Sequence, residues 1–399
     1  MAKSLITRFR VQNFKALRDV TLDLTPVHLL IGPNDSGKTS ILEALAGICR
    51  SVDHLPLSKA FLGSWTGRGL VWHGEADLPV SLEVHQESAV PLTYRLKCLF
   101  PETAREARVE SEIAELPTGT TDFATSGSPE TAVSSILQQR RRVGEELRHV
   151  ARQVYDALAG IHYYRWDPEM LSLPVVLNAK RKYRMDPSGF GLAQCLDDIL
   201  GFDPNRFLEL QRRFKTIFPD VKSVKLIPES AYRVPFDNPE AVTALQDRAD
   251  GKGIYFEMKE GGQQVAARQA SDGVLLVLAY LALLHIPKPP PLLLLEEPEN
   301  GIHPQRLGDI VKILRELAEE EVGPQIVLTT HSPYLVDLFE PREVTVCVKQ
   351  ADGSVAVRRL SESRKVREQM DVFTLGEIWT AIGDQALMES AAADEGTKP

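Results

Sequence analysis

The sequence predicts an α/β fold built around a phosphate-binding loop, and three observations indicate it. Residues 32–39 match Gly-x-x-x-x-Gly-Lys-Ser/Thr, with an apolar strand-like run (27–31) before them and a helix with one apolar face (40–48) after them. Four leucines at 292–295 lead into Glu296 and Glu297. A third apolar run, 325–330, ends at His331. Buried strands that end in polar side chains are typical of α/β sheets that carry a ligand site at one edge.

The loop has the chemistry needed to bind phosphate. Glycines let the backbone fold into a concave nest, and its N–H groups, with those of the following helix N-terminus, point at phosphate oxygens. Lys38 is expected to reach the β- and γ-phosphates, and the Thr39 hydroxyl to bind Mg²⁺. The predicted phosphate-binding residues are Gly32, Pro33, Asn34, Asp35, Ser36, Gly37, Lys38, Thr39 and Ser40.

Composition describes an ordinary soluble protein. The chain has 399 residues, 43% of them hydrophobic and 25% charged, which is enough for one large domain or two ordinary ones. The net charge of −9 argues against a uniformly basic nucleic-acid binder but leaves room for a local basic patch. The four cysteines are far apart and form no metal-binding pattern, as expected in a reducing cytoplasm. The longest apolar run, 274–286, is too short to cross a bilayer, so we expect a cytoplasmic protein without membrane contact.

The first part of the chain, 1–100, is expected to form strands around the phosphate loop. Alternating apolar and polar residues predict strands at 4–14, 19–24, 78–84 and 93–100. Residues 101–159 are expected to be a helical arm inserted into the head, with helices at 102–115 and 131–158 and a flexible link at 117–129. A surface helical hairpin without a role is the alternative for this arm.

The second part, 160–388, is expected to complete the sheet and add most of the helices. Strands are predicted at 161–166, 221–227, 254–259, 292–295, 325–330, 344–348 and 355–360. Helices are predicted at 191–200, 205–218, 271–286, 305–320 and 333–339, with prolines from Pro287 ending the third of them. Residues 389–399 are small and polar and are expected to be a disordered tail.

The acidic strand end and the later histidine suit nucleotide hydrolysis. Glu296 is assigned to the metal and Glu297 to the attacking water, which it would orient and deprotonate. His331 is a candidate ligand of the γ-phosphate, although a lone histidine of this kind is more often structural. Ser271-Asp272-Gly273 opens an apolar helix; these residues are a plain N-cap or, since a helix N-terminus attracts anions, a phosphate site.

Together these motifs, in this order, resemble the ABC-type ATPase heads of the SMC/RecF-like superfamily, and among them the stand-alone AAA family ATPases related to RecF and to the OLD (overcoming lysogenisation defect) proteins. The resemblance rests on Asn13-Phe14-Lys15, on 32–40 as Walker A, on 271–273 as the signature motif, on 292–304 as Walker B with the D-loop, and on His331 as the switch histidine. Leu375-Gly376-Glu377-Ile378-Trp379 also looks like the C-terminal segment of such ATPases. The resemblance implies a P-loop NTPase fold with a mixed sheet, flanking helices and an inserted helical arm.

The resemblance also implies a mechanism. Two heads would close around two ATP molecules with Mg²⁺, and Ser271 and Gly273 of one chain would complete the Walker A site of the other. ATP would hold this homodimer and hydrolysis would open it.

The sequence departs from the family pattern in several places. Glu296 stands where Asp is usual and Asp272 where Gly is usual, and Gln86 is only a candidate for the glutamine of the Q-loop. There is no long coiled coil, so the ring-forming role of SMC proteins does not transfer. This sequence has 68 residues after His331, and we expect these to be too few for the TOPRIM nuclease domain of OLD proteins.

Two functions remain open, with a third ranked last. The first is a nucleotide-driven switch that acts on DNA or RNA in repair or in defence against mobile elements. Its support is Arg140-Arg141-Arg142 and the basic run 180–184, whose alternative is a solvated charged surface. The second is a switch that holds or releases a partner effector or toxin protein. A transporter subunit is the third.

Overall fold

The computed structural model describes residues 4–53, 57–61, 67–74, 78–100, 108–123, 145–179, 182–233 and 248–388. The chain divides into two compact units. The first unit comprises residues 1–162, 290–294 and 324–399, and the second comprises residues 163–289 and 295–323. The Walker A loop and His331 therefore belong to the first unit, whereas Glu296, Glu297 and Ser271 belong to the second.

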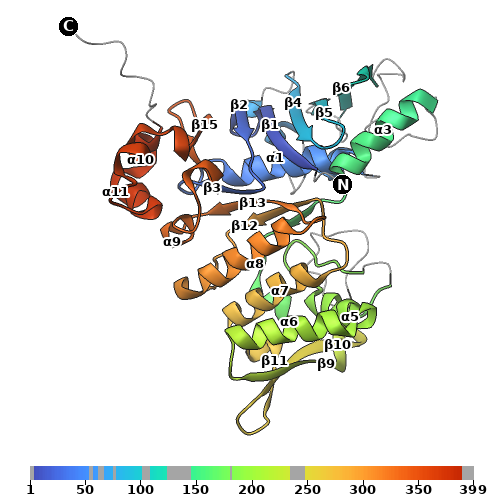
Figure 1. Ribbon diagram of the computed structural model, residues 1–399. Coiled ribbons are helices and arrows are strands. Elements are labelled where there is room, and N and C mark those ends of the chain that lie inside the picture. The colour runs from blue at the N-terminus through green and yellow to red at the C-terminus, as the bar shows by residue number, and fades with distance from the viewer. Residues whose placement is uncertain are drawn as a thin grey trace. The chain divides into compact units, whose positions relative to one another are not determined.

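An antiparallel sheet forms part of the first unit, with the strand order β2-β1-β4-β5-β6-β7 (Figure 1). Its strands are β1 (Leu5–Phe14), β2 (Leu17–Asp23), β4 (Val80–Glu87), β5 (Leu92–Leu99), β6 (Arg108–Leu116) and β7 (Gly119–Asp122). Side chains alternate across it as expected of a half-buried sheet: Phe9 and Val11 are buried while Arg8 and Arg10 are exposed. The turn from β1 to β2 is fastened to the following helix by an ion pair between Lys15 and Glu43.

The second sheet of the first unit is mostly parallel and carries the phosphate loop. Its order is β15-β14-β3-β13-β12-β8. The strands are β3 (Val27–Ile31), β12 (Leu292–Glu296, which passes into the second unit at Leu295), β13 (Gln325–Thr330), β14 (Val344–Lys349) and β15 (Val355–Arg359). Every residue of β3 and β13 is buried, which explains their unbroken apolar runs. The chain first leaves this unit at β8 (His162–Tyr164).

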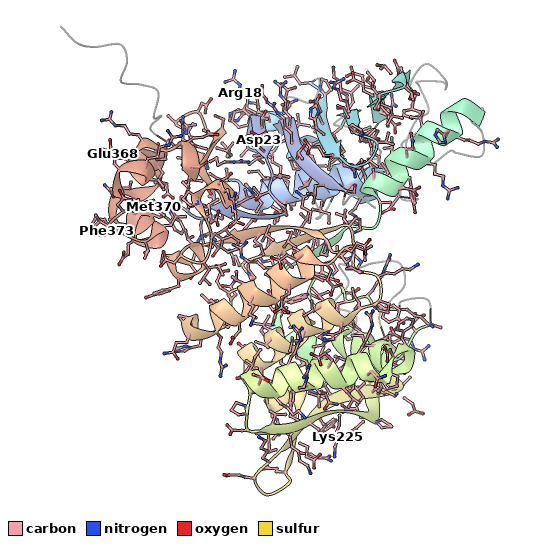
Figure 2. All side chains as sticks on the ribbon, viewed as in Figure 1. Arg18, Asp23, Lys225, Glu368, Met370 and Phe373 are labelled. Carbon is pink, nitrogen blue, oxygen red and sulfur yellow. The ribbon has the colours of Figure 1, made fainter. Side chains whose placement is uncertain are left out.

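The helices of the first unit flank these sheets. They are α1 (Lys38–Ser51), α2 (Leu57–Ala60), α3 (Glu145–Leu158), α9 (Pro333–Val336), α10 (Arg364–Gln369) and α11 (Leu375–Leu387). Short 3₁₀ turns occupy Gly67–Leu70, Trp72–Gly74, Pro341–Glu343 and Leu360–Glu362. The segment between α10 and α11 exposes apolar side chains, among them Met370 and Phe373 (Figure 2).

The second unit is a helical layer with a small antiparallel sheet. Its helices are α4 (Pro168–Ser172), α5 (Leu192–Phe202), α6 (Pro204–Ile217), α7 (Asp272–His285) and α8 (Leu307–Glu319), with 3₁₀ turns at Ala267–Gln269 and Pro304–Arg306. The sheet has the order β11-β10-β9, from β9 (Val221–Tyr232), β10 (Arg248–Met258) and β11 (Gln264–Ala266). Helix α7 is the centre of this unit, since it packs against α4, α5, α6 and α8 and is buried from Leu275 to His285.

The prediction for the first half of the helical arm is wrong. Residues 108–116, which overlap the helix expected at 102–115, form β6, and part of the expected flexible link at 117–129 forms β7. Glutamate and alanine in 102–115 favour a helix, but pairing with β5 places Glu112 in the core, where it accepts a hydrogen bond of 2.8 Å from the Tyr94 hydroxyl. Only α3 matches the second expected helix, and 124–144 lies outside the described residues, as do Arg140-Arg141-Arg142, Lys180, Arg181 and the expected tail at 389–399.

In the described ranges of the chain, no helix is both long and apolar enough to span a bilayer.

Candidate active site

The phosphate loop follows β3 in the first unit and is shaped by backbone conformations that favour glycine. Gly32 has φ of 143°, Asp35 of 66° and Gly37 of 88°. Gly32 also lies against β14, because a Cβ atom there would stand 2.3 Å from the carbonyl oxygen of Cys347. A side chain at Gly32 would therefore move the loop, so the first glycine of the motif is required by packing as well as by conformation.

Lys38 lies over this loop. It is 5% exposed, and its Nζ donates hydrogen bonds of 2.8 Å to the carbonyl oxygens of Gly32 and Pro33. Gly37 is the N-cap of α1 and has no side chain to cap the helix. A buried ammonium group and the N-terminus of a 14-residue helix thus meet at one loop, and both favour an anion. Thr39 is exposed and Ser40 half-buried in the first turn of α1.

Most of the remaining loop residues are exposed, and one of them forms an ion pair that the sequence did not reveal. Pro33, Asn34 and Asp35 are exposed, whereas Ser36 is buried. Asp35 forms an ion pair with Lys349 at the end of β14. The two residues are 314 positions apart, and no local pattern marks the pair.

His331 follows β13 and lies at the same sheet edge as the phosphate loop. Strands β3 and β13 are parallel neighbours with Ile31 opposite Thr330, so Gly32 and His331 are the next residues at that edge. The turn after β13 is held by a 2.9 Å hydrogen bond from the Ser332 amide to Thr330 Oγ1. The register therefore brings together the loop and the histidine that the sequence linked only by motif order.

The acidic strand end lies in the second unit. The Glu296 side chain is 3% exposed, its Oε2 lies 3.5 Å from Arg165 Nε, and its buried Oε1 has no hydrogen-bond partner. Glu297 has φ of 47°, an uncommon conformation for a residue with a side chain. It accepts a 2.6 Å hydrogen bond from Asn300 Nδ2, within a turn closed by the Asn300 amide and the Glu297 carbonyl.

Glu296 fits a hard divalent cation better than it fits any protein partner it has. A buried carboxylate oxygen without a hydrogen bond is costly, and oxygen is the ligand that Mg²⁺ prefers. Within the described ranges no group of three or more histidines, cysteines or acids could hold a metal alone. Mg²⁺ at Glu296 would thus need ligands from phosphate and water, which is how it binds in most nucleotide sites.

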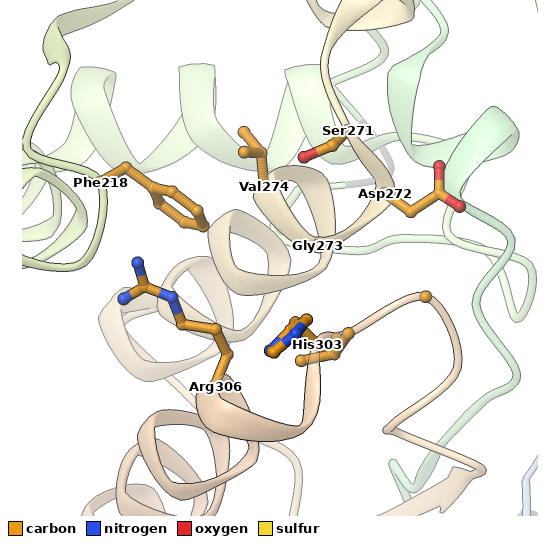
Figure 3. A pocket seen from close by; sticks show the side chains of 9 residues that line it. Phe218, Ser271, Asp272, Gly273, Val274, His303 and Arg306 are labelled. Atoms are coloured by element: carbon orange, nitrogen blue, oxygen red, sulfur yellow. The ribbon is translucent and has the colours of Figure 1, made fainter.

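A pocket of about 500 Å³ opens at the N-terminus of α7 in the second unit (Figure 3). Ser271 is the N-cap residue, but its side chain makes no capping hydrogen bond. Gly273 allows close packing, with its Cβ position 3.4 Å from the carbonyl oxygen of Gly301. Arg306 lies over the Phe218 ring at 5.2 Å and adds a positive charge to the lining. Ser271 thus takes the expected N-cap position without the capping hydrogen bond, and the positive end of the helix dipole faces the pocket.

Gln86, the candidate Q-loop residue, is a buried part of the first unit. Its Nε2 donates to Ser4 Oγ and, over 3.2 Å, to the carbonyl oxygen of Ala157 at the end of α3. These contacts fasten β4 to α3 and give it a structural role.

Known proteins match both parts of the chain. Residues 5–101 match a family model described as an AAA ATPase domain, and residues 164–337 match one described as "AAA domain, putative AbiEii toxin, Type IV TA system". An OLD nuclease of Thermus scotoductus is 24% identical over 394 residues, covering 90% of this chain and 65% of that protein. The crystal structure of an SMC head bound to the C-winged helix domain of ScpA superposes with a TM-score of 0.50 at 15% identity, covering 91% of this chain and 99% of that one.

The chain has the fold of ABC-type ATPase heads and is similar to proteins of the SMC, RecF and OLD type. This bears out the expected resemblance and the α/β P-loop fold. The ATPase head also shares 36% identity over 90 residues with the ribose import ATP-binding protein RbsA 2 of Streptomyces avermitilis, which is 22% of this chain and 15% of that protein. It spans less than two thirds of the length of either relative.

Proposed function

We propose that this ATPase head binds ATP with Mg²⁺, hydrolyses it, and works as a dimerising switch that acts on nucleic acid. The observation that carries the proposal is the buried Lys38 ammonium over the phosphate loop, held by two loop carbonyls at the start of an uncapped helix. No neutral ligand needs this combination, whereas a polyphosphate does.

The residues divide the reaction between them. Lys38 and the loop amides bind the β- and γ-phosphates and balance their charge. Glu297 takes a proton from the attacking water while the water oxygen bonds to the γ-phosphorus. The bond between the γ-phosphorus and the bridging oxygen breaks, and ADP leaves. His331 donates to a γ-phosphate oxygen. Mg²⁺, held by Glu296 and Thr39, would neutralise phosphate charge when bound.

The pocket at α7 supports a second copy as the partner. Ser271 and Gly273 would bind the γ-phosphate of ATP held by the other chain, because this helix N-terminus opens on a pocket and the Ser271 side chain makes no capping hydrogen bond there. A homodimer closed by ATP follows from this assignment, and hydrolysis would release it.

Nucleic acid is the proposed target because the OLD nuclease is the relative that matches most of the chain. A partner effector or toxin is the second candidate, favoured by the toxin–antitoxin description of the model that matches 164–337. DNA binding that weakens steeply with salt supports the first, and binding to a protein without any DNA shift at low salt supports the second.

Replacing Lys38 tests the nucleotide site. Lys38→Ala removes the cation that faces the phosphates, and we expect ATP affinity measured by calorimetry to fall at least tenfold, about 1.4 kcal/mol. Lys312→Ala, on the exposed face of α8, is the matched control and should bind ATP as the wild type does. Equal affinity in Lys38→Ala and the control would overturn the assignment.

A further inference from the structure

Arg165 is a charged residue of the second unit that the proposed mechanism does not use. It follows β8, and its Nε lies 3.5 Å from Glu296 Oε2. The exposure of the two side chains is very unequal, at 69% for Arg165 and 3% for Glu296. A largely exposed arginine side chain therefore contacts a carboxylate that is almost fully buried.

The backbone around Arg165 is held by several contacts, whereas 69% of the side chain is exposed. Its amide donates a 2.9 Å hydrogen bond to the carbonyl oxygen of Pro187. The next residue, Trp166, packs its ring 4.7 Å from that of Tyr280 on α7. The Tyr280 hydroxyl donates over 3.3 Å to the carbonyl oxygen of Pro298, in the turn that follows Glu296. These contacts hold the base of the Arg165 side chain beside Glu296, whereas its exposed guanidinium can swing away.

The charges at Glu296 do not suit two cations. One oxygen faces Arg165, and the other is buried without a partner. A divalent cation bound to this carboxylate would lie a few ångströms from the guanidinium, close enough for the two positive charges to repel each other. Either cation can neutralise the carboxylate, but each makes the other less favourable there.

We propose that Arg165 neutralises the Glu296 carboxylate while no metal is bound, and that a metal bound to this carboxylate displaces the guanidinium. This inference rests on the assignment of Glu296 as a metal ligand in the proposed function. Arg165 is thus a positioning residue: it neutralises the buried carboxylate in the empty site and lowers the affinity of that site for the metal.

Metal titration tests the competition. We expect Arg165→Gln to bind Mn²⁺ about tenfold more tightly than the wild type, about 1.4 kcal/mol, when free Mn²⁺ is followed by electron paramagnetic resonance in saturating ADP. A residue with a merely structural role would leave the affinity unchanged or weaken it, and either result would overturn the inference. Arg212→Gln is the matched control, because Arg212 is 75% exposed and pairs with Glu209 on a surface helix, and it should bind Mn²⁺ as the wild type does.

Glu296→Gln separates this inference from the proposed function. If Glu296→Gln binds Mn²⁺ as tightly as the wild type, the metal assignment of the proposed function fails. If it loses Mn²⁺ but Arg165→Gln shows no tightening, only the inference fails.

A measurement on the wild-type chain covers the case in which Arg165→Gln does not fold. The Nε–H signal of Arg165, assigned by its loss in Arg165→Lys, should exchange faster with solvent when Mg²⁺ is added with ADP, since the guanidinium leaves Glu296. An exchange rate that Mg²⁺ does not change would overturn the inference.

Discussion

At the scale of single residues, a buried histidine makes the first unit sensitive to acid. His28 lies in β3, is fully buried, and has ring nitrogens 3.1 Å from Thr25 Oγ1 and 3.0 Å from Thr345 Oγ1. Burial lowers the pKa of His28 to about 3, mainly because the charged ring would lose its hydration, with a smaller contribution from Arg359. The neutral form is therefore the one that the fold accepts.

The free energy of unfolding should fall as the pH falls below about 6.5. Below that pH His28 is protonated in the unfolded chain, whereas in the folded chain it stays neutral down to about pH 3. The loss should approach about 1.4 kcal/mol per pH unit within this window, measured from urea unfolding curves. His28→Gln should flatten the dependence, whereas His149→Gln, at an exposed position of α3, should keep it. A dependence equally steep in His28→Gln would show that another group controls it.

Functional side chains that belong to a local sequence motif can be predicted from the sequence. Side chains whose role depends on a partner far away in the sequence cannot. Lys38, Glu296 and His331 each follow a recognisable strand or loop pattern. Arg165 and Lys349 do not, because the meaning of each depends on a carboxylate more than 100 residues away, Glu296 or Asp35. Only the fold can place such pairs.

At the scale of elements, the phosphate loop depends on how closely it approaches β14. Gly32→Ala requires a Cβ at 2.3 Å from the carbonyl oxygen of Cys347 as well as an unfavourable φ of 143°. Gly119→Ala is the matched control, since Gly119 has φ of 140° but nothing within 4 Å of its Cβ position.

We expect Gly32→Ala to be destabilised by about 1–3 kcal/mol more than Gly119→Ala in chemical unfolding, and to lose ATP binding because the loop must move. Equal destabilisation of the two variants would mean that the close approach to Cys347 does not constrain the loop.

The same scale shows where element prediction works and where it fails. Strands β3, β12 and β13 are recognised because buried parallel strands need continuous apolar runs. Strand β6 is missed because its residues favour a helix, and what decides its structure is pairing with β5 and the buried contact between Tyr94 and Glu112. The structure of such a strand depends on its neighbours more than on its own sequence.

At the scale of the whole molecule, this ATPase head would supply one half of each ATP site, and a second copy would supply the other half. Ser271, the N-cap residue of α7, makes no side-chain capping hydrogen bond and lines a pocket, and we assign it to the ATP of a second copy. Glu297→Gln should keep ATP binding but slow hydrolysis by about 10²–10⁴-fold, because the proposed general base is lost. The ATP-bound state would then persist long enough to be observed.

The most direct test is the mass of Glu297→Gln in solution, by light scattering, with and without Mg-ATP. The account predicts a monomer that becomes a dimer only with Mg-ATP, and a return to the monomer when Ser271→Arg is added, with ATP binding retained. An unchanged mass while ATP is bound, or a dimer that persists with Ser271→Arg, would contradict the central claim that ATP joins two copies through α7.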